Sequence, residues 1–311
     1  MSKFHYCTIV SNSHLFKAIA LYKSLAAKCN DFCLSILCYD EEVYTVLSQK
    51  GWPGVQLLKP EDIEDEQLLT AKGNRNGWEY AWTLKPAFLR YIMLSDSEAA
   101  YFALFDADIY FYSSPNAIFE ENPEAALFLT DHNNSPEFVK YYDISGRFNS
   151  GFVGCKNNKV ALMAVTWWVE QAIDWCYAKL DTENKRYGDQ RYLEVFPVMF
   201  SSEVHVVRSK GANAAHWNIG KYDVKKRDGE IYLDEDKLIF YHFSGLFIYN
   251  SKEYNLSWAI RIPEAALQHI YLPYLNELAG IIHEIELTHP PYKSYGFQRP
   301  EAGKEMHYVE I

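Results

Sequence analysis

The sequence predicts an α/β fold built on a largely parallel sheet within one large domain. Strand and helix patterns alternate from the first residues onward, which is typical of β-α-β units. The 311 residues suffice for one large core, and a composition of 49% hydrophobic and 23% charged residues is ordinary for a globular protein. No apolar run approaches the roughly twenty residues that a membrane span requires.

The amino-terminal part of the chain predicts three strands separated by two helices. The strands are expected at 4–12, 32–40 and 54–60, and the helices at 14–29 and 41–51. The stretch "FCLSILCYD" is apolar and ends in an acid, whereas "HLFKAIALYKSLAAKC" has apolar residues at near-helical spacing. This order is the opening of a parallel sheet of the kind that binds nucleotides.

The next region predicts a central strand that ends in acidic residues. Residues 61–82 are polar and irregular, 83–96 form an amphipathic helix, and "AAYFALFDADIYFY" at 99–112 is the central strand. In open α/β sheets, ligands bind beyond the carboxyl ends of the strands. The stretch "LFDADIYFYSSP" therefore places its two aspartates at such an end.

The remaining elements are read from the same patterns. Expected are strands at 124–132, 148–157 (broken by glycine), 203–209 and 237–246, a loop at 133–147, a helix at 159–178, a hairpin with an Asp-Gly turn at 226–230, a helical tail at 259–286 and an irregular terminus at 288–300.

Charge and cysteine usage restrict the classes of partner. With 30 basic and 41 acidic residues the net charge is −11, which opposes broad binding to a phosphate backbone, so we expect no nucleic-acid partner.

The amino terminus enters a strand without a signal-peptide pattern, which predicts a cytoplasmic location. Apolar surroundings without CxxC spacing indicate reduced core thiols for Cys7, Cys29, Cys33, Cys38, Cys155 and Cys176.

Asp106 and Asp108 form a candidate metal site. One residue apart, they share a face if the strand continues through them, and two carboxylates that close repel one another unless a cation lies between them. Hard oxygen ligands favour Mg²⁺ or Mn²⁺, and few protein ligands suffice when substrate phosphates complete the octahedron. A solvated turn with no ligand is the alternative interpretation.

His242 is a second candidate, far away in the sequence. It lies in "FYHFSGL", again where an apolar strand ends, and it offers an imidazole that can bind a metal. The following turn, Ser244-Gly245, has backbone N–H groups that can bind phosphate oxygens. A packed strand histidine without a ligand is the alternative.

Five segments in this order carry a family resemblance: "YFALFDADIYFYSSP", "FNSGFVG", "GDQRYL", "HWNIGKYDV" and "FYHFSGL". They resemble the landmarks of GT-A fold nucleotide-sugar glycosyltransferases, nearest to glycosyltransferase family 8 and related bacterial enzymes. The resemblance implies a single Rossmann-like GT-A catalytic domain with a mixed central sheet over residues 1–250. Residues 251–311 would form a helical and irregular extension packed on it.

The resemblance also implies a set of site residues. Asp106 would contact the ribose and the metal, Asp108 would chelate the metal, and His242 would be the third protein ligand of a Mn²⁺ or Mg²⁺ ion. The other implied positions are Val10, Ser11 and Asn12 around the base, Asp40 near the uracil or ribose, Asn149, Ser150 and Gly151 along the donor sugar, Asp189 and Gln190 beneath it, and Gly245 at the phosphates.

The sequence offers several candidates for the lysine that neutralises the diphosphate. Lys85 precedes the central strand and can neutralise a phosphate, with Arg90 as a second candidate. Family 8 enzymes often continue from the histidine as HxxGxxKPW, but "HFSGLFIYNSKEY" has no Lys-Pro-Trp, so Lys221 and Lys252 are candidates beside Lys85.

The acceptor side is predicted only loosely. Trp217 and Asn218 resemble a landmark near it, and the loop 133–147 is expected to shape an acceptor groove. The tail aromatics either contribute to that groove, contact a membrane face or pack on the core; they are Tyr271, Tyr274, Tyr292, Tyr295 and Phe297.

The expected function is a metal-dependent hexosyltransferase. The resemblance implies a nucleotide-sugar donor, by default a UDP-hexose, and a glycan or glycolipid acceptor in the synthesis of bacterial surface polysaccharide or lipopolysaccharide. Retention of configuration is expected, with the leaving phosphate accepting the acceptor's proton. Weak peripheral contact with the inner face of the cytoplasmic membrane is an additional expectation, and the oligomeric state is open.

Other functions fit the motifs in part. An inverting transferase would use Asp189 as the base, and a nucleotide- or sugar-binding protein without turnover has no need for a diphosphate-chelating metal. In haloacid-dehalogenase-like phosphatases the DxD motif opens the fold, whereas here it follows a hundred residues. A glycoside hydrolase would need two carboxylates about 5 Å or more apart on facing elements.

Overall fold

The main sheet lies between two layers of helices. The structure is a computed structural model that describes residues 3–294, 296–299, 303 and 305–311. Among these residues, the main sheet has seven strands in the order β3-β2-β1-β4-β7-β6-β8. Its strands are β1 (Phe4–Val10), β2 (Cys33–Cys38), β3 (Val55–Leu58), β4 (Tyr101–Phe105), β6 (Leu127–Asp131), β7 (Phe148–Lys156) and β8 (Val204–Val206).

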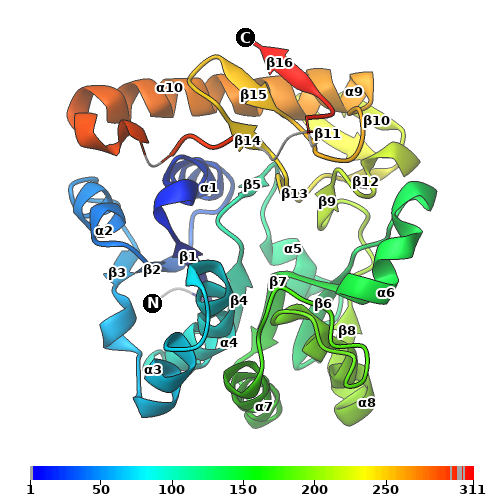
Figure 1. Cartoon of the computed structure of the whole chain (residues 1–311). Helices are drawn as coiled ribbons and strands as arrows, with labels where there is room; N and C mark the ends of the chain where they lie inside the picture. Colours follow the sequence, from blue (N-terminus) through cyan, green and yellow to red (C-terminus); the bar gives the residue numbers. More distant parts are fainter. Residues whose placement is uncertain (1–2, 295, 300–302, 304) are drawn as a thin grey trace.

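The strand directions decide where a ligand can bind. β1 pairs in parallel with β2 and β4, β2 with β3, and β6 with β8, whereas β7 pairs antiparallel with both β4 and β6. The sheet is therefore mixed, with β7 running against the other strands. The carboxyl ends of β1, β2, β4, β6 and β8 all lie along one edge, which faces the upper layer of the molecule in Figure 1.

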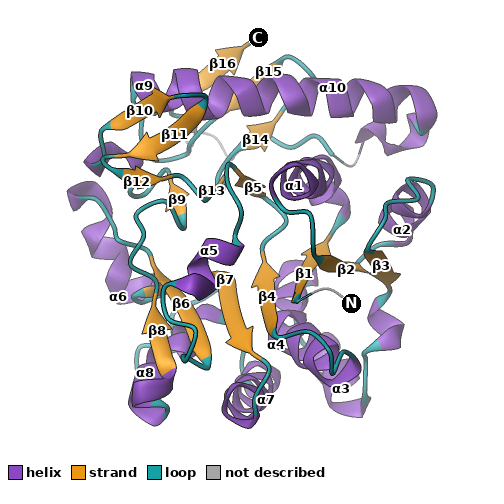
Figure 2. Cartoon of the chain, turned by 180° about the vertical axis from the view of Figure 1, so that it is seen from behind, coloured by secondary structure: helices purple, strands orange, loops and turns teal. Residues whose placement is uncertain are grey.

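Helices cover both faces of this sheet and form two cores. α1 and α2 pack on one face with the carboxy-terminal elements, and α3, α4 and α7 pack on the other (Figures 1 and 2). The α-helices are α1 (Leu15–Lys28), α2 (Glu41–Ser48), α3 (Glu66–Lys72), α4 (Gly77–Ser95), α5 (Asn116–Glu120), α6 (Tyr142–Ser145), α7 (Lys159–Asp174), α8 (Phe196–Met199), α9 (Glu264–Ala266) and α10 (Leu272–Thr288). The 3₁₀ helices of the described residues are η1 (Asn12–His14), η2 (Pro60–Asp62), η3 (Pro136–Tyr141), η4 (Gln190–Val195), η5 (Ser201–Glu203), η6 (Ile219–Lys221) and η8 (Pro290–Ser294), and η7 (Leu267–Tyr271) is a π-helix.

The central strand differs from the expected 99–112. It divides into β4 and β5 (Ile109–Phe111), and the turn between them holds Asp106 and Asp108. The Ile109 N–H donates to the Asp106 carbonyl at 3.2 Å, which closes the turn. The two aspartates therefore lie on a bend rather than on one face of a strand, because β5 leaves the main sheet to pair with β13 (Phe240–His242).

β7 agrees in part with the expected strand broken by glycine. It runs from Phe148 to Lys156 as one strand, and its pairing with β4 continues past Gly154, from Phe152 to Lys156. The irregularity lies in β7 itself near Gly151, because Leu129 pairs with Val153 and Thr130 with Asn149, which leaves residues 150–152 of β7 without partners in β6. This bulge brings Thr130 opposite Asn149, at the edge where the ligand-binding residues gather.

Two segments expected to be irregular contain helices. The polar stretch 61–82 holds α3 and the first turns of α4, because Asn76 caps α4 by accepting a hydrogen bond from the Glu79 N–H, while the Glu79 carboxylate binds the Asn76 N–H. The segment 133–147 holds η3 and α6. In the first segment the signal of the helix is a cap rather than an apolar stripe, whereas η3 and α6 have no side-chain cap.

Short sheets form the layer above the main sheet. β13 joins β5 and β9 (Ala214–Ala215). The expected Asp-Gly hairpin is confirmed: β10 (Val224–Arg227) and β11 (Glu230–Leu233) flank Asp228 and Gly229, both with positive φ. β12 (Asp236–Lys237) extends this hairpin, and β14 (Phe247–Ile248), β15 (Glu253–Asn255) and β16 (Tyr308–Glu310) form another sheet.

The carboxy-terminal segment is built into the core. α10 packs along α1, and Tyr112 donates to the Ile270 carbonyl at 3.0 Å. Of the three alternatives for the tail aromatics, packing on the core holds for Tyr271, Tyr274 and Tyr292, which are buried, and Phe297 packs on Phe16. Tyr295 lies outside the described residues.

Two further properties of the chain concern its thiols and its helices. The cysteines are free thiols; all are buried except Cys33, which is half-buried. Among the described residues, no helix combines the length and apolar character that crossing a membrane requires.

Candidate active site at the carboxyl edge of the sheet

A cavity of about 800 Å³ opens where β1, β2 and β4 end. The loop after β1, the loop after β2, one face of α4, the β4–β5 turn, the start of β7 and the segment before η4 all contribute to its wall. Among the sequence-predicted residues, its lining includes Ser11, Asn12, Asp40, Lys85, Asp106, Asp108, Asn149, Ser150, Asp189, Gln190 and His242. Most of the predicted site therefore converges on one place.

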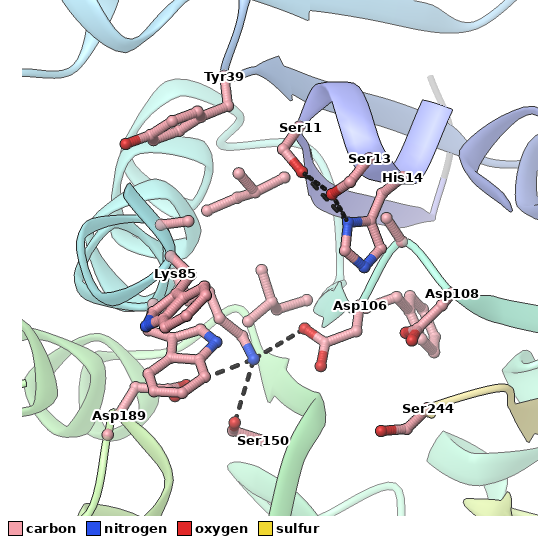
Figure 3. A pocket seen from close by; sticks show the side chains of 18 of the residues that line it. Ser11, Ser13, His14, Tyr39, Lys85, Asp106, Asp108, Ser150, Asp189 and Ser244 are labelled. Carbon is pink, nitrogen blue, oxygen red and sulfur yellow. Dashed lines mark hydrogen bonds and ion pairs between the residues drawn. The ribbon is translucent and has the colours of Figure 1, made fainter. Parts of the chain in front are cut away.

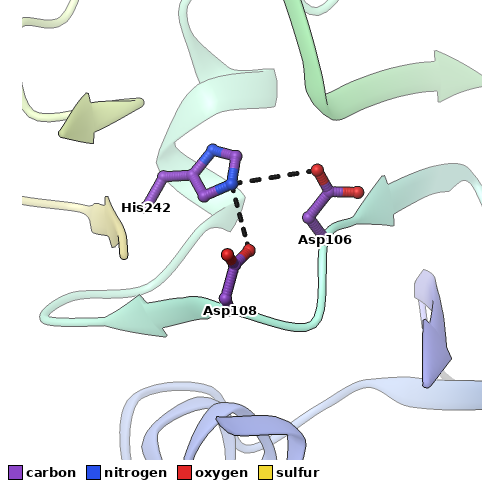
Figure 4. A group of neighbouring side chains, drawn as sticks. All are labelled: Asp106, Asp108 and His242. Carbon is purple, nitrogen blue, oxygen red and sulfur yellow. Dashed lines mark ion pairs between the residues drawn. The ribbon is translucent and has the colours of Figure 1, made fainter. Parts of the chain in front are cut away.

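Asp106, Asp108 and His242 converge on a point in this cavity (Figure 4). The His242 Nε2 atom lies 3.0 Å from the Asp108 Oδ1 atom and 3.8 Å from the Asp106 Oδ2 atom. The pairing of β13 with β5 brings them together, since His242 lies opposite Ile109 in that register. One ligand atom from each residue lies within 4.8 Å of the others, so one ion can reach all three.

These residues fit a divalent metal ion. Two carboxylates and one imidazole are ligands that Mn²⁺ accepts, and a hard carboxylate pair is also suitable for Mg²⁺. Burial opposes ionisation of Asp108, but His242, Lys17 and His14 outweigh it and hold the pKa of this carboxyl well below its usual range. A deprotonated carboxylate is the form that binds a metal.

Gly151 makes room for the His242 ring. A Cβ atom at this position would lie 2.5 Å from the His242 Cε1 atom and 2.6 Å from the Asn149 Oδ1 atom. On another side, the Trp217 ring contacts His242 edge-on, with ring centroids 5.3 Å apart. The imidazole is therefore held between a glycine and an indole.

Replacing Gly151 by alanine is expected to displace His242 and to weaken Mn²⁺ binding about 10-fold to 100-fold. The fold should survive, because a single added methyl group costs about 1–3 kcal/mol. Calorimetric titration with Mn²⁺ measures the affinity. Gly220→Ala is the matched control, since a Cβ atom there meets nothing within 4 Å. Equal Mn²⁺ affinity in the two variants would contradict the assigned role of Gly151.

Lys85 lies between two acids, Asp106 and Asp189 (Figure 3). Its Nζ atom lies 2.7 Å from the Asp106 Oδ1 atom and 3.4 Å from the Asp189 Oδ2 atom, and it donates to the Ser150 hydroxyl at 3.1 Å. Burial opposes the charge of Lys85, but Asp106 and Asp189 outweigh it and raise its pKa. Burial raises the pKa of Asp189, although the positive charge of Lys85 acts to lower it. Asp106 thus has one oxygen on the lysine and the other toward His242.

A hydrogen-bond network orders the sugar-lining candidates. The Gln190 Oε1 atom accepts from the Asn149 side chain and from the Ser150 N–H, both at 3.1 Å. The Gln190 Nε2 atom donates to the Ser145 carbonyl at 2.8 Å, and Asn149 Oδ1 accepts from the Gly151 N–H at 3.0 Å. Asn149 and Gln190 are therefore fixed in orientation, with polar atoms at the cavity wall.

The loop after β1 forms the far end of the cavity. The Asp40 carboxylate accepts from the Asn12 N–H at 2.6 Å, which joins the loops after β1 and β2. Ser11 and Ser13 contact the Nδ1 atom of His14 at 3.2 and 2.9 Å (Figure 3). Val10 is buried in β1 and does not line the cavity.

Several other candidates lie outside the cavity wall. Gly245 has φ +78° and packs against Trp258 and His216, so its role is in the turn after His242. Lys221 donates to the Asn133 carbonyl at 2.9 Å, and Lys252 follows β14; neither they nor Arg90 line the cavity. Of the candidate lysines, Lys85 is the one that the structure places at the site.

The structure adds residues that sequence reasoning missed. Trp78 and Trp82 lie on the same face of α4 as the predicted Lys85, along the cavity and at the spacing of successive helical turns. Trp78 is 65% exposed, and Tyr187 packs near Trp82. Lys17 is buried behind the site, where its Nζ atom donates to the Leu246 carbonyl at 2.9 Å. A predicted helix that began at residue 77 instead of 83 would have placed Trp78 and Trp82 on the same helix face as Lys85.

Comparisons of sequence give two relatives. The uncharacterized protein YfnD of Bacillus subtilis (strain 168) is 47% identical over the whole of both chains. The uncharacterized protein YfnF of the same organism is 32% identical over 93% of this chain and 96% of its own. No protein-family model matches the chain.

Comparisons of structure give glycosyltransferases. The galactosyltransferase LgtC, solved with donor and acceptor sugar analogues, superposes with a TM-score of 0.54 at 12% identity, over 89% of this chain and 96% of its own. An active-site mutant of LgtC gives 0.56 at 12% identity over 96% and 99%. The apo glycosyltransferase GlyE of Streptococcus pneumoniae TIGR4 gives 0.51 at 14% identity over 92% and 64%. These similarities confirm the GT-A fold and the mixed central sheet.

Proposed function

We propose that this chain, which belongs to the family of the Bacillus subtilis proteins YfnD and YfnF and has the GT-A fold, is a metal-dependent glycosyltransferase. It moves a sugar from a nucleoside diphosphate donor to a glycan or glycolipid acceptor. The observation that carries the proposal is the cluster of Asp106, Asp108 and His242 at the carboxyl edge of the sheet, in the wall of a cavity of about 800 Å³.

The cavity suits an extended nucleotide sugar. Asn12 and Asp40 at one end offer polar groups to a base and ribose, and the acid-histidine cluster in the middle suits a diphosphate held through a metal. Asn149, Asp189 and Gln190 at the other end offer polar groups to the donor sugar. This order along the sheet edge follows the order of base, diphosphate and sugar in the donor.

Each charged residue has a separate task in the proposal. Asp106, Asp108 and His242 would hold Mn²⁺ or Mg²⁺, which supplies Lewis-acid stabilisation of the charge that develops on the leaving diphosphate. Lys85 fixes the orientation of Asp106 through its 2.7 Å contact and keeps a positive charge beside the donor sugar. Gln190 orients Asn149 and the backbone of Ser150 toward the same sugar.

We further propose that the sugar keeps its anomeric configuration. An inverting enzyme needs an accessible carboxylate as the base for the acceptor hydroxyl. Asp189, the sequence candidate for that base, is buried and pairs with Lys85 at 3.4 Å. In the retaining alternative the leaving phosphate accepts the acceptor's proton, and Asp189 acts by positioning Lys85. The anomeric configuration of the product distinguishes the two.

The proposed donor is a UDP-hexose, and the proposed acceptor class is a surface polysaccharide or lipopolysaccharide. The support is the resemblance of the five motifs to family 8 and the fold shared with LgtC, a galactosyltransferase bound to donor and acceptor sugar analogues.

Calorimetric binding of UDP, GDP and CDP to the wild-type protein tests this function. We expect one nucleotide to bind in the presence of Mn²⁺, and EDTA to weaken that binding by at least about tenfold, because the diphosphate is held through the metal. Uridine, which has no phosphates, is the control and should show no dependence on Mn²⁺. If none of the nucleotides binds, the proposal fails; if one binds but its sugar conjugate is never hydrolysed or transferred, the protein binds nucleotides without turnover.

A further inference from the structure

A second cavity, of about 300 Å³, lies along the same sheet edge where β6 and β8 end. Thr130 and Asp131 line it from the end of β6, and Arg208 and Lys210 from the loop after β8. β7 separates the two cavities at its amino end, because Arg147, just before the strand, faces the second cavity and Asn149 faces the first. Two residues along a strand span about 7 Å, so ligands in the two cavities would be neighbours.

We propose that this second cavity binds an anionic saccharide, one bearing a phosphate or carboxylate group, and that it is the acceptor side of the enzyme. That an anion binds here is inferred from the cavity itself, whereas the role of the cavity as the acceptor side rests on the proposed function. Figure 1 shows the region where β6 and β8 reach the layer that holds β9 and β12.

Cationic side chains gather at this cavity although the chain carries a net charge of −11. The side chains of Arg147, Arg208 and Lys210 are 55%, 77% and 44% exposed. Lys221 lies beside them on Asn133, and burial together with the positive charge of Lys210 lowers its pKa against the pull of Asp131. An anion at this place would relieve the repulsion between the two lysines.

The guanidinium groups retain free donors. Arg147 uses its Nε atom on the Asp131 Oδ2 atom at 2.7 Å, and the Arg208 Nε atom lies 3.9 Å from the Glu121 Oε2 atom. Within the described part of the chain, the Nη groups of both side chains form no hydrogen bond to protein. The Lys210 Nζ atom pairs with Asp234 at 2.8 Å, an exposed ion pair of the kind that contributes little and can exchange partners. Arginine Nη groups bind phosphate and carboxylate in two-point contacts.

The cavity floor suits a sugar rather than a bare ion. Thr130 is only 2% exposed, and its hydroxyl has no hydrogen-bond partner among the described residues. A buried hydroxyl of this kind is costly unless a ligand or water satisfies it. Val206 and the half-buried ring of Tyr222 supply apolar surface beside it, on which a pyranose ring can lie.

The chemistry of this cavity differs from that of the first. Among the described residues, the group of acidic and histidine side chains that can hold a metal ion lies in the first cavity. The second cavity has instead arginine and lysine side chains around one aspartate. It therefore suits an anion bound directly, without a bridging metal, and binding there should not depend on a divalent cation.

Ligand-observed NMR with glucose 6-phosphate, glucuronate and glucose, all in EDTA, tests the proposal. We expect both anions to bind and glucose to bind much more weakly. Arg147→Gln and Arg208→Gln should each weaken anion binding about tenfold, because a charged hydrogen bond is lost. Arg227→Gln is the matched control, since Arg227 does not line this cavity and is also an exposed arginine paired with one carboxylate, Glu235 at 2.8 Å.

Each result is decisive for the proposal. Anion binding that survives EDTA and Asp108→Ala but weakens in the two arginine variants supports it. Absence of binding in EDTA, equal binding of glucose, or no effect of Arg147→Gln and Arg208→Gln overturns it. Inorganic phosphate that binds as tightly as glucose 6-phosphate overturns the saccharide part. Failure of metal-dependent nucleotide binding would instead remove the proposed function and leave this site standing.

Discussion

Replacing Asp108 by asparagine is expected to abolish metal-dependent nucleotide binding and to slow sugar transfer about a thousandfold. The change keeps the shape of the side chain but removes its charge, and an amide oxygen is a weaker metal ligand than a carboxylate. A metal contributes several kcal/mol to the stabilisation of a leaving diphosphate, which corresponds to this factor. Asp108 is the more informative of the two aspartates, because Asp106 also binds Lys85.

Nucleotide titrations with and without Mn²⁺, followed by rates of donor hydrolysis, measure this effect. Nucleotide affinity in Mn²⁺ should fall to the level that the wild type shows in EDTA. Asp174→Asn is a suitable control, since Asp174 is an exposed aspartate in an ion pair with Arg186 at 3.0 Å, at the end of α7. A variant Asp108→Asn that retained Mn²⁺-dependent binding would show that the cluster does not hold the metal.

Replacing Lys85 by methionine is expected to lower the free energy of unfolding by about 3–5 kcal/mol. The change leaves the buried carboxylate of Asp189 and the half-buried carboxylate of Asp106 without their shared cation, and an unpaired buried charge costs this much. Removing the second charge as well, in Lys85→Met with Asp189→Asn, should recover part of the loss, because the two residues form one network.

Urea unfolding at neutral pH measures the change. Lys225→Met is the control, since Lys225 pairs with Asp223 on an exposed strand and should cost less than about 1 kcal/mol. If Lys85→Met is as stable as this control, the ion pairs of Lys85 with Asp106 and Asp189 contribute nothing to the fold. If the double variant is no more stable than Lys85→Met alone, the lysine and Asp189 are not coupled.

Much of the candidate site could be predicted from local pattern. Asp106, Asp108 and His242 each lie where an apolar strand ends. His242 reaches the cluster through β13, which lies outside the main sheet and pairs with β5. The two aspartates follow β4, and the carboxyl ends of parallel strands meet at one edge. The same rule brought Asn12 and Asp40 to the cavity. The roles of Asn149, Ser150 and Gln190 required the resemblance, because nothing in a glycine-containing strand or a Gly-Asp-Gln turn indicates a sugar.

Other features could not be read from local pattern. The break between β4 and β5 depends on β13, which lies much later in the chain. Because β5 pairs with β13, it does not continue in the main sheet. The helix α4 begins earlier than its apolar stripe because Asn76 and Glu79 cap it, and so Trp78 was missed. The boundary at residue 250 between a catalytic domain and its extension stays a prediction.

The sequence by itself determined which residues can carry the chemistry: two aspartates at a strand end, a histidine at another, and an α/β alternation that places strand ends together. This works because strand and helix periodicity depend on neighbouring residues. The tertiary structure alone decided that β7 runs against its neighbours, that Lys85 lies between Asp106 and Asp189, and that a cationic cavity lies next to the acidic one. These features are contacts between distant segments, and their geometry follows from strand order and register, which the packing of the whole core sets.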